Sequence, residues 1–198
     1  MKIIIIGATG TIGKHITKAL QQDHEVIKVG STSGDLQVDI SSSASIENLF
    51  KQVGSFDALI STTGNGHFGP LKTMTEKDFR VGLDSKLMGQ INLVLIGQHY
   101  INPKGSFTLT SGILSDDPVL LGANLSAVNG AINGFVRAAA IELENGIRIN
   151  TVSPGVVEES PVYFPYFQGH IPVTMDRVTQ AYVKSALGAL TGQVFQVV

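Results

Sequence analysis

The feature that most constrains this chain is a run of four isoleucines, Ile3–Ile6, that leads directly into the glycine-rich segment GATGTIG. A continuous run of β-branched residues indicates a strand buried on both faces, which is typical of a parallel sheet. Gly7, Gly10 and Gly13 then permit a tight turn and a close approach of backbone amides to a ligand. In a strand–loop–helix context, such glycines hold a pyrophosphate at the helix N-terminus. The segment therefore predicts a nucleotide-binding loop, and the alternative is that the glycines only form a turn.

Strands and helices alternate along the rest of the chain. Further strands are expected at residues 25–29, 36–40, 56–61, 105–110, 147–152 and 192–197, and helices at 14–22, 45–53, 75–100, 125–144 and 176–190. Thr75 is a suitable N-cap for the long helix because Asp78 follows it at the position that completes a capping box. Strand–helix alternation implies right-handed crossovers and a parallel sheet with helices on both faces. We therefore predict one doubly wound α/β domain over residues 1–198.

Two segments depart from this alternation. The connection between the second and third expected strands has only about six residues, which is too few for a crossover helix. Residues 156–175 contain Tyr163, Phe164, Tyr166 and Phe167, with interspersed prolines and no periodic pattern. We expect this second segment to be a loop or lid over a substrate site.

Composition excludes several classes of protein. The 198 residues are 43% hydrophobic and 15% charged, which is the opposite of the balance that keeps a chain disordered. The formal net charge of −2 argues against nucleic acid as a partner. Because the chain has no cysteine, it has no disulfide, thiol nucleophile or thiolate metal site, and we expect no bound metal. No apolar run is long enough for a membrane span or a signal peptide, so we expect a cytoplasmic protein without a membrane partner.

Several further motifs resemble those of the short-chain dehydrogenase/reductase family, and they occur in the family's order. GATGTIG is followed by Asp39 in VDIS, by Ser61–Gly64 in place of the family's Asn-Asn-Ala-Gly turn, and by the helix sequence GFVRAAAIEL. RINTVSPG, at residues 148–155, matches the family's segment beside the nicotinamide, and Thr191-Gly192-Gln193 matches its last strand. The resemblance implies a Rossmann fold with seven parallel strands, a bound nicotinamide dinucleotide, and hydride transfer to or from a small carbonyl or alcohol.

The resemblance also implies which residues bind the cofactor. They are Gly7, Thr9, Gly10, Thr11, Ile12, Gly13, Ser31, Thr32, Asp39, Ile40, Ser61, Thr62, Thr63, Gly64, Asn129, Pro154, Gly155 and Val156. Sheets that select NAD usually carry an acidic residue at the end of the second strand, where this chain reads VGSTS. Without a carboxylate, this segment does not repel the 2′-phosphate of NADP, and its serine and threonine hydroxyls can bind that phosphate. The segment has no arginine, however. The segment favours NADP over NAD.

The positions that correspond to the family's catalytic residues are mostly changed. The family uses Ser, Tyr and Lys, with an Asn on the preceding long helix. Ser111 occupies the serine position, whereas Leu125 stands at the tyrosine position, Asn129 at the lysine position and Lys86 at the asparagine position. Leucine can neither donate nor accept a proton, and general acid–base catalysis contributes about 10²–10⁴-fold. The standard mechanism therefore cannot run unchanged.

Substitute groups are available near these positions. Lys86 shares a helix face with Gly82 and Gly89, which would let the helix approach the sheet closely. If Lys86 is buried near Ser111, its pKa falls toward neutrality and it can donate or relay a proton; otherwise it extends to solvent. Ser111 either orients a substrate oxygen or simply ends a strand, and Asn129 either binds the nicotinamide ribose or is a satisfied polar residue. Weaker candidates are His67 in the segment GNGHFGPL, and Tyr163 and Tyr166 in the expected lid.

Two functions follow from these patterns. The first is a divergent NADP- or NAD-dependent oxidoreductase with a small-molecule substrate, catalytic Ser111 and Lys86, and a non-standard active site. The second is a catalytically inactive sensor or regulatory protein that binds the dinucleotide. The retained backbone motifs favour the enzyme. Apolar stripes on the two long helices, at residues 75–100 and 125–144, further indicate a homodimer or homotetramer.

Overall fold

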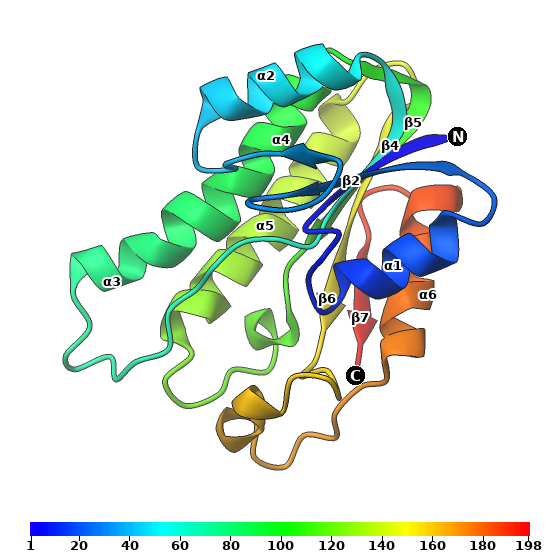
Figure 1. The fold of residues 1–198 in the computed structure, drawn as a ribbon. Coiled ribbons are helices and arrows are strands. Elements are labelled where there is room, and N and C mark those ends of the chain that lie inside the picture. The colour runs from blue at the N-terminus through cyan, green and yellow to red at the C-terminus, as the bar shows by residue number, and fades with distance from the viewer.

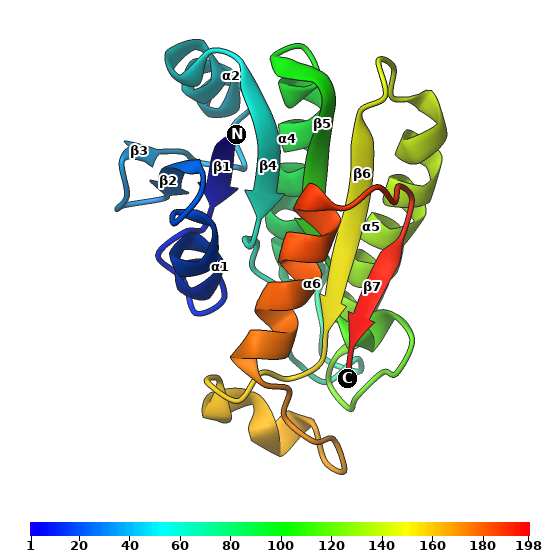
Figure 2. The same ribbon diagram turned by 90° about the vertical axis from the view of Figure 1, so that its right-hand side faces the viewer.

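The computed structural model describes residues 1–198 and has one sheet of seven parallel strands. The strands lie in the order β3-β2-β1-β4-β5-β6-β7, as Figure 2 shows. Their bounds are Lys2–Ile6 (β1), Glu25–Gly30 (β2), Leu36–Gln37 (β3), Phe56–Ser61 (β4), Ile101–Thr110 (β5), Arg148–Pro154 (β6) and Val194–Val197 (β7). The predicted doubly wound Rossmann fold is confirmed. Its order reverses between β1 and β4, where open sheets of this type bind their ligands.

Helices cover both faces of the sheet. On one face lie α1 (Gly13–Leu20) and α6 (Met175–Leu187), and on the other lie α2 (Ser43–Val53), α4 (Gly89–Gly97) and α5 (Ala123–Glu142), as Figure 1 shows. Each face has its own apolar core, because alternate residues of the buried strands point to opposite sides. Ile4 and Ile6 belong to the core beneath α2, α4 and α5, and Ile3 and Ile5 to the core beneath α1 and α6. No helix has the length and apolar character that crossing a bilayer requires.

The connection between β2 and β3 has no helix, as the sequence predicts, and β3 is shorter than expected. After Gly30 the chain turns back and pairs Leu36 with Val29 in parallel. Asp35 holds this turn, because its carboxylate accepts a hydrogen bond of 2.9 Å from the amide of Lys28 and its own amide donates to the Lys28 carbonyl at 2.7 Å. Only Leu36–Gln37 pair as a strand, since Asp39 already belongs to the turn that precedes α2.

The long helix expected at residues 75–100 is not a uniform α-helix. Its start is as predicted, because Thr75 and Asp78 form a capping box ahead of α3, Glu76–Arg80. Residues Val81–Met88 then widen into a π-helical segment before α4 begins. The expectation that Gly82 and Gly89 bring this helix against the sheet is wrong. A Cβ at Gly82 would lie 2.4 Å from Asn124 Oδ1 of α5, and one at Gly89 would lie 2.8 Å from Ile40 Cδ1.

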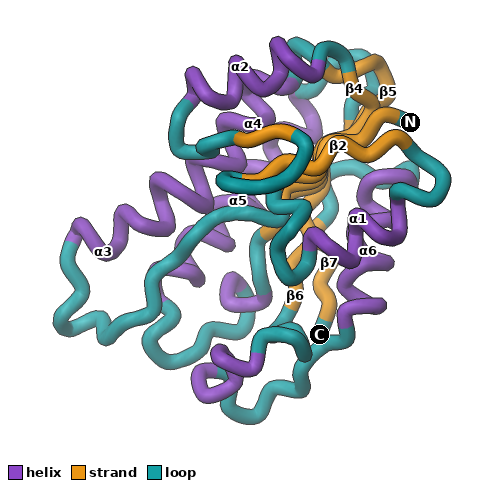
Figure 3. Tube along the Cα trace, viewed as in Figure 1, coloured by secondary structure: helices purple, strands orange, loops and turns teal.

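Other boundaries differ from the expected ones by a few residues. The fifth strand begins at Ile101 because a change of register between Phe56 and Ala58 extends its pairing with β4. The last helix ends at Leu187, and the last strand begins only at Val194. The segment expected to be a loop contains a short 3₁₀ helix, Pro161–Tyr166. Figure 3 shows that this segment lies with other loops beyond the carboxyl ends of β6 and β7.

Candidate functional site

The glycine loop after β1 has the tight geometry that its sequence predicts. Gly7 has a φ of 83°, a backbone conformation that residues other than glycine rarely adopt. A Cβ at Gly13 would lie 2.0 Å from the Gly7 carbonyl oxygen, so the start of α1 is in direct contact with the turn. The next loop along this edge is tied to the same turn, because the Thr62 hydroxyl donates to the carbonyls of Ile6 and Gly7 at 3.1 and 3.2 Å.

This loop leaves a row of unused donors at the start of α1. The amides of Thr11, Ile12 and Gly13 donate to no backbone carbonyl. They lie at a helix N-terminus, where unpaired N–H groups and the helix dipole favour a negatively charged ligand. The loop is therefore suited to a phosphate group.

A cavity of about 350 Å³ lies beside the loop at the carboxyl ends of the strands. It brings together residues from five parts of the sequence: the glycine loop, the segment after β4, the π-helical segment, the end of β5 with α5, and the segment after β6. The lining residues are Ile12, Gly64, Asn65, Gly66, Phe68, Lys86, Thr110, Ser111, Gly112, Ile113, Leu114, Leu125, Asn129, Pro154, Gly155, Val156, Val157, Ser160, Tyr163 and Phe167. Both expected catalytic residues, Ser111 and Lys86, are among them.

Lys86 contacts the end of β5. Its ammonium donates a hydrogen bond of 2.8 Å to the backbone carbonyl of Ser111. The residue keeps some exposure along its length, but no acidic side chain pairs with it. Burial of the ammonium lowers the pKa of Lys86 to about 8, because a charge in an apolar surrounding loses its hydration. A group with this pKa can both donate and accept a proton near neutral pH.

Two further polar atoms at the cavity have no hydrogen-bond partner. They are Ser111 Oγ and Asn129 Oδ1, and each residue is only 2% exposed. A buried polar atom without a partner costs free energy of about 1–3 kcal/mol. Unpaired atoms of this kind are therefore expected where a ligand completes the hydrogen bonds.

The segment after β4 is packed closely against Lys86 and Leu125. Gly64, with a φ of 112°, lies so close to Lys86 that a Cβ there would be 2.5 Å from the Lys86 Cα. A Cβ at Gly66 would be 2.1 Å from Cδ2 of Leu125. The two glycines thus let the segment pass between the π-helical segment and α5. Leu125 is part of this packing and contributes an apolar wall to the cavity.

Two positioning residues were not found from the sequence. Gln90, which is fully buried, bonds both the amide and the carbonyl of Thr110 at 2.8 Å and donates to the Lys86 carbonyl at 3.2 Å. Asn124 accepts from the amide of His67 at 2.9 Å and donates to the Phe79 carbonyl at 2.7 Å. The only signal for Gln90 is a polar residue near the start of the otherwise mostly apolar helix sequence GQINLVLIG.

The segment expected to be a lid contacts the segment after β4 and α1. Tyr166 stacks on Phe68 with ring centroids 4.6 Å apart, and Tyr163 lies 6.0 Å from the same ring. Glu159 pairs with Lys14 at 2.7 Å and with His15 at 2.8 Å, both on α1. These partners hold the pKa of Glu159 below its usual range, and Lys14 has the larger effect. The contacts hold the segment beside the cavity.

Other expected cofactor residues lie on the same sheet edge but outside this cavity. Ser31 and Thr32 are exposed after β2, and Thr9 Oγ1 lies 3.1 Å from Ser33 Oγ. Asp39 is exposed and accepts two hydrogen bonds from Ser41, which lower its pKa. Gly7, Gly10, Thr11, Gly13, Ile40, Ser61, Thr62 and Thr63 likewise do not line the cavity. His67 and Tyr166 do not line it either, whereas Tyr163 does.

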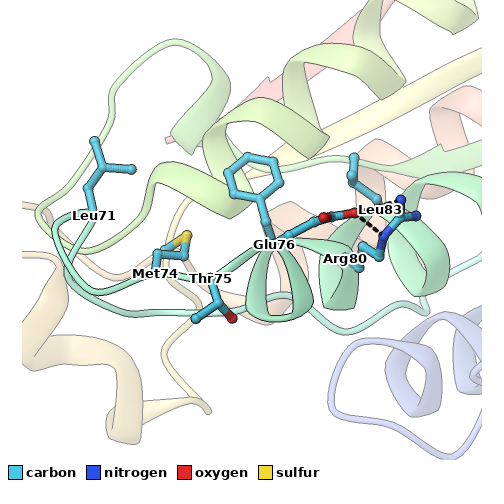
Figure 4. A pocket seen from close by; sticks show the side chains of 7 residues that line it. Leu71, Met74, Thr75, Glu76, Arg80 and Leu83 are labelled. Carbon is cyan, nitrogen blue, oxygen red and sulfur yellow. Dashed lines mark hydrogen bonds and ion pairs between the residues drawn. The ribbon is translucent and has the colours of Figure 1, made fainter.

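A second hollow, of about 360 Å³, lies at the start of α3 and is drawn in Figure 4. It is lined by Leu71, Met74, Thr75, Glu76, Phe79, Arg80 and Leu83. Its two charged side chains, Glu76 and Arg80, already pair with each other at 2.9 Å. The hollow contains no unpartnered buried polar atom, so the first cavity is the better candidate site. No group of three or more His, Asp or Glu side chains could hold a metal ion.

Comparisons with known proteins show the family and the fold to which the chain is similar. A family model described as enoyl-(acyl carrier protein) reductase, which represents short-chain dehydrogenases/reductases, matches residues 7–166. The crystal structure of the protein lin1944 from Listeria innocua is 48% identical, with a TM-score of 0.98 and full coverage of both chains. A small-chain dehydrogenase crystallised in complex with NADPH is 28% identical, with a TM-score of 0.89 over 100% of this chain and 96% of that one.

Curated sequences show similar relationships at greater distance. An oxidoreductase of Methylorubrum extorquens is 26% identical over 178 residues, which cover 78% of this chain and 72% of that protein. The chain spans 58% and 55% of the length of two further curated relatives.

Proposed function

Because the chain belongs to the short-chain dehydrogenase/reductase family, an oxidoreductase family, we propose that it is an NADP(H)-dependent enzyme that interconverts a small carbonyl compound and its alcohol. Its proton-transfer group is Lys86 in place of the family's tyrosine, and Ser111 orients the substrate oxygen. The observation that carries the proposal is the contact of Lys86 with the end of β5 in a cavity that also holds two unpaired polar atoms.

The residues at the site fit a nicotinamide dinucleotide. The free amides of Thr11, Ile12 and Gly13 would bind its diphosphate. The turn that presents these amides has no room for a Cβ at Gly13, so glycine is needed there. Asn129 and the Pro154–Val156 segment would hold its nicotinamide end in the cavity. When bound, the nicotinamide supplies or accepts the hydride.

We assign the remaining chemistry to side chains of this chain. The Ser111 hydroxyl, which has no internal partner, donates a hydrogen bond to the substrate carbonyl oxygen. The Lys86 ammonium stabilises the negative charge that develops on that oxygen and then transfers a proton to it. A pKa of about 8 leaves Lys86 mostly protonated at neutral pH, as carbonyl reduction requires. Leu125 and the lid rings exclude water from the reaction.

NADP is the preferred cofactor in this proposal. The end of β2 presents the hydroxyls of Ser31, Thr32 and Ser33, and the nearby Asp35 carboxylate is engaged with Lys28. The NADPH complex of the 28%-identical small-chain dehydrogenase supports this choice. The residues 156–175 act as the lid in the same proposal, within a single domain of residues 1–198.

We also propose that the protein is a homodimer or homotetramer. Val81, Met88 and Leu95 repeat every seven residues along the π-helical segment and α4, and they are 40%, 41% and 47% exposed. Ile141 on α5 is 86% exposed. Apolar side chains aligned in this way on neighbouring helices favour burial against a second copy.

The proposal is tested by following NADPH oxidation with a panel of small ketones and aldehydes. We expect turnover by the wild type, a loss of about 10²–10⁴-fold in Lys86→Ala, and a smaller loss in Ser111→Ala. Lys77→Gln, a change of an exposed lysine on α3, is the control and keeps wild-type activity. Cofactor binding without turnover of any substrate would instead favour the non-catalytic sensor. The presence of Leu125 and Asn129, where the family has Tyr and Lys, supports that alternative.

A further inference from the structure

The cavity has one charged side chain and no counter-ion. Lys86 is the only Lys, Arg, Asp or Glu among the residues that line it. Its ammonium has three N–H groups, of which one bonds the Ser111 carbonyl. The other two have no protein acceptor, and no salt bridge includes this lysine. A buried cation without a partner is unfavourable unless a ligand supplies the negative charge.

The neighbouring polar atoms indicate where the negative charge of the ligand lies relative to its reacting carbonyl. Ser111 Oγ has a free donor, and it belongs to the same residue whose carbonyl holds the Lys86 ammonium. A ligand with two oxygen-bearing groups on adjacent atoms can use both donors, one group for each. A carboxylate bonded directly to a carbonyl carbon has this arrangement.

The rest of the cavity is apolar and aromatic. Phe68, Tyr163 and Phe167 contribute rings from the segment after β4 and from the lid, and Leu125 contributes an aliphatic wall. A flat apolar group can pack against such rings.

We propose that the substrate of this site is a 2-oxo acid with an apolar, ring-sized side chain. Its carboxylate binds the Lys86 ammonium, its carbonyl oxygen accepts from the Ser111 hydroxyl, and its side chain lies against Phe68 and Tyr163. This assignment rests on the proposed function, because it names the substrate class of the same site. It makes Lys86 a determinant of specificity as well as a proton donor.

The test compares two ligands that differ only in charge. Benzoylformate and its neutral amide, benzoylformamide, are titrated at pH 7 into the protein with saturating NADP⁺, and binding is measured by calorimetry. We expect the acid to bind about tenfold or more tightly than the amide, as a charge-assisted hydrogen bond predicts. The ratio falls to near one in Lys86→Gln, is kept in Lys86→Arg, and is unchanged in the control Lys77→Gln.

The proposal is overturned if the amide binds as tightly as the acid, if neither binds at millimolar concentration, or if Lys86→Gln keeps the preference. The proposed function can fail separately, since NADP⁺ binding is measured first in the same experiment. Turnover of neutral ketones with NADPH, without turnover of 2-oxo acids, would keep the proposed function and overturn this inference. Circular dichroism of each variant verifies that the fold is retained.

Discussion

The ammonium of Lys86 and the backbone carbonyl of Ser111 are joined by a hydrogen bond of 2.8 Å, which links the π-helical segment to the end of β5. A carbonyl satisfies one donor of the ammonium without neutralising its charge. Burial therefore determines the pKa of Lys86 and lowers it to about 8, whereas a carboxylate partner would have raised it. The charge remains available to a ligand.

This relationship predicts how stability depends on pH. The pKa of Lys86 is about 8 in the folded protein, against 10.5 for the ordinary side chain. Between these values the unfolded chain binds more protons than the folded one, so the free energy of unfolding rises with pH in this window through Lys86. Below pH 8 the lysine is charged in both states, and the cost of its burial, roughly 3 kcal/mol at most, is fully present.

Lys86→Met isolates this effect from other titrating groups. We expect urea unfolding at pH 7 to show the methionine variant as stable as the wild type or more stable, because the desolvated charge is gone. That advantage shrinks between about pH 8 and pH 10.5. A stability difference that does not change with pH would contradict the assignment of a lowered pKa to this lysine.

The packing of Leu125 predicts the effect of placing a tyrosine at residue 125 and a lysine at residue 129. Leu125 lies against Gly66, and a tyrosine there would require the segment after β4 to move. We expect Leu125→Tyr with Asn129→Lys to lose about 1–3 kcal/mol of stability from overpacking and to gain no turnover. Denaturation and NADPH oxidation measure both. A double variant of wild-type stability with raised activity would contradict this prediction.

The sequence predicts the fold and the glycine loop well because both depend on local patterns. Ile3–Ile6 and the glycines that follow determine a buried strand and a tight turn within a few residues of each other. The π-helical segment was not predictable, because the apolar periodicity of the sequence describes an ordinary α-helix. The roles of Gln90 and Asn124 depend equally on tertiary contacts, which one sequence does not display.

The aromatic contacts of the proposed lid, residues 156–175, predict its mobility. Removing the Phe68 ring deletes its stacking on Tyr166, a pair worth about 0.5–1.5 kcal/mol. We expect Phe68→Ala to accelerate amide hydrogen exchange over residues 160–170 severalfold, with little change in the sheet. Leu71→Ala is the control, because Leu71 is exposed and follows Phe68 by three residues. Equal exchange in the two variants would mean that the ring does not hold the lid.

The exposed apolar stripe predicts the effect of a charge on assembly. If Met88 and Leu95 lie between copies, then Met88→Glu with Leu95→Glu buries two unpaired carboxylates and dissociates the oligomer. Light scattering after size exclusion reports the mass. Leu187→Glu on α6, where leucine is 40% exposed, should leave the mass unchanged. A wild type that is monomeric at all concentrations would remove the basis of this prediction.

Calorimetric titration of NADPH into the wild type and into Gly13→Ala tests the glycine loop itself. We expect saturable binding of one NADPH per chain in the wild type. We expect none in Gly13→Ala, where the added Cβ would lie 2.0 Å from the Gly7 carbonyl oxygen and displace the donors of the loop. Gly130→Ala, a glycine of α5 with nothing near its added Cβ, keeps wild-type binding. No heat of binding in a folded wild type, or equal affinity in Gly13→Ala, would contradict the central claim that this loop binds the cofactor.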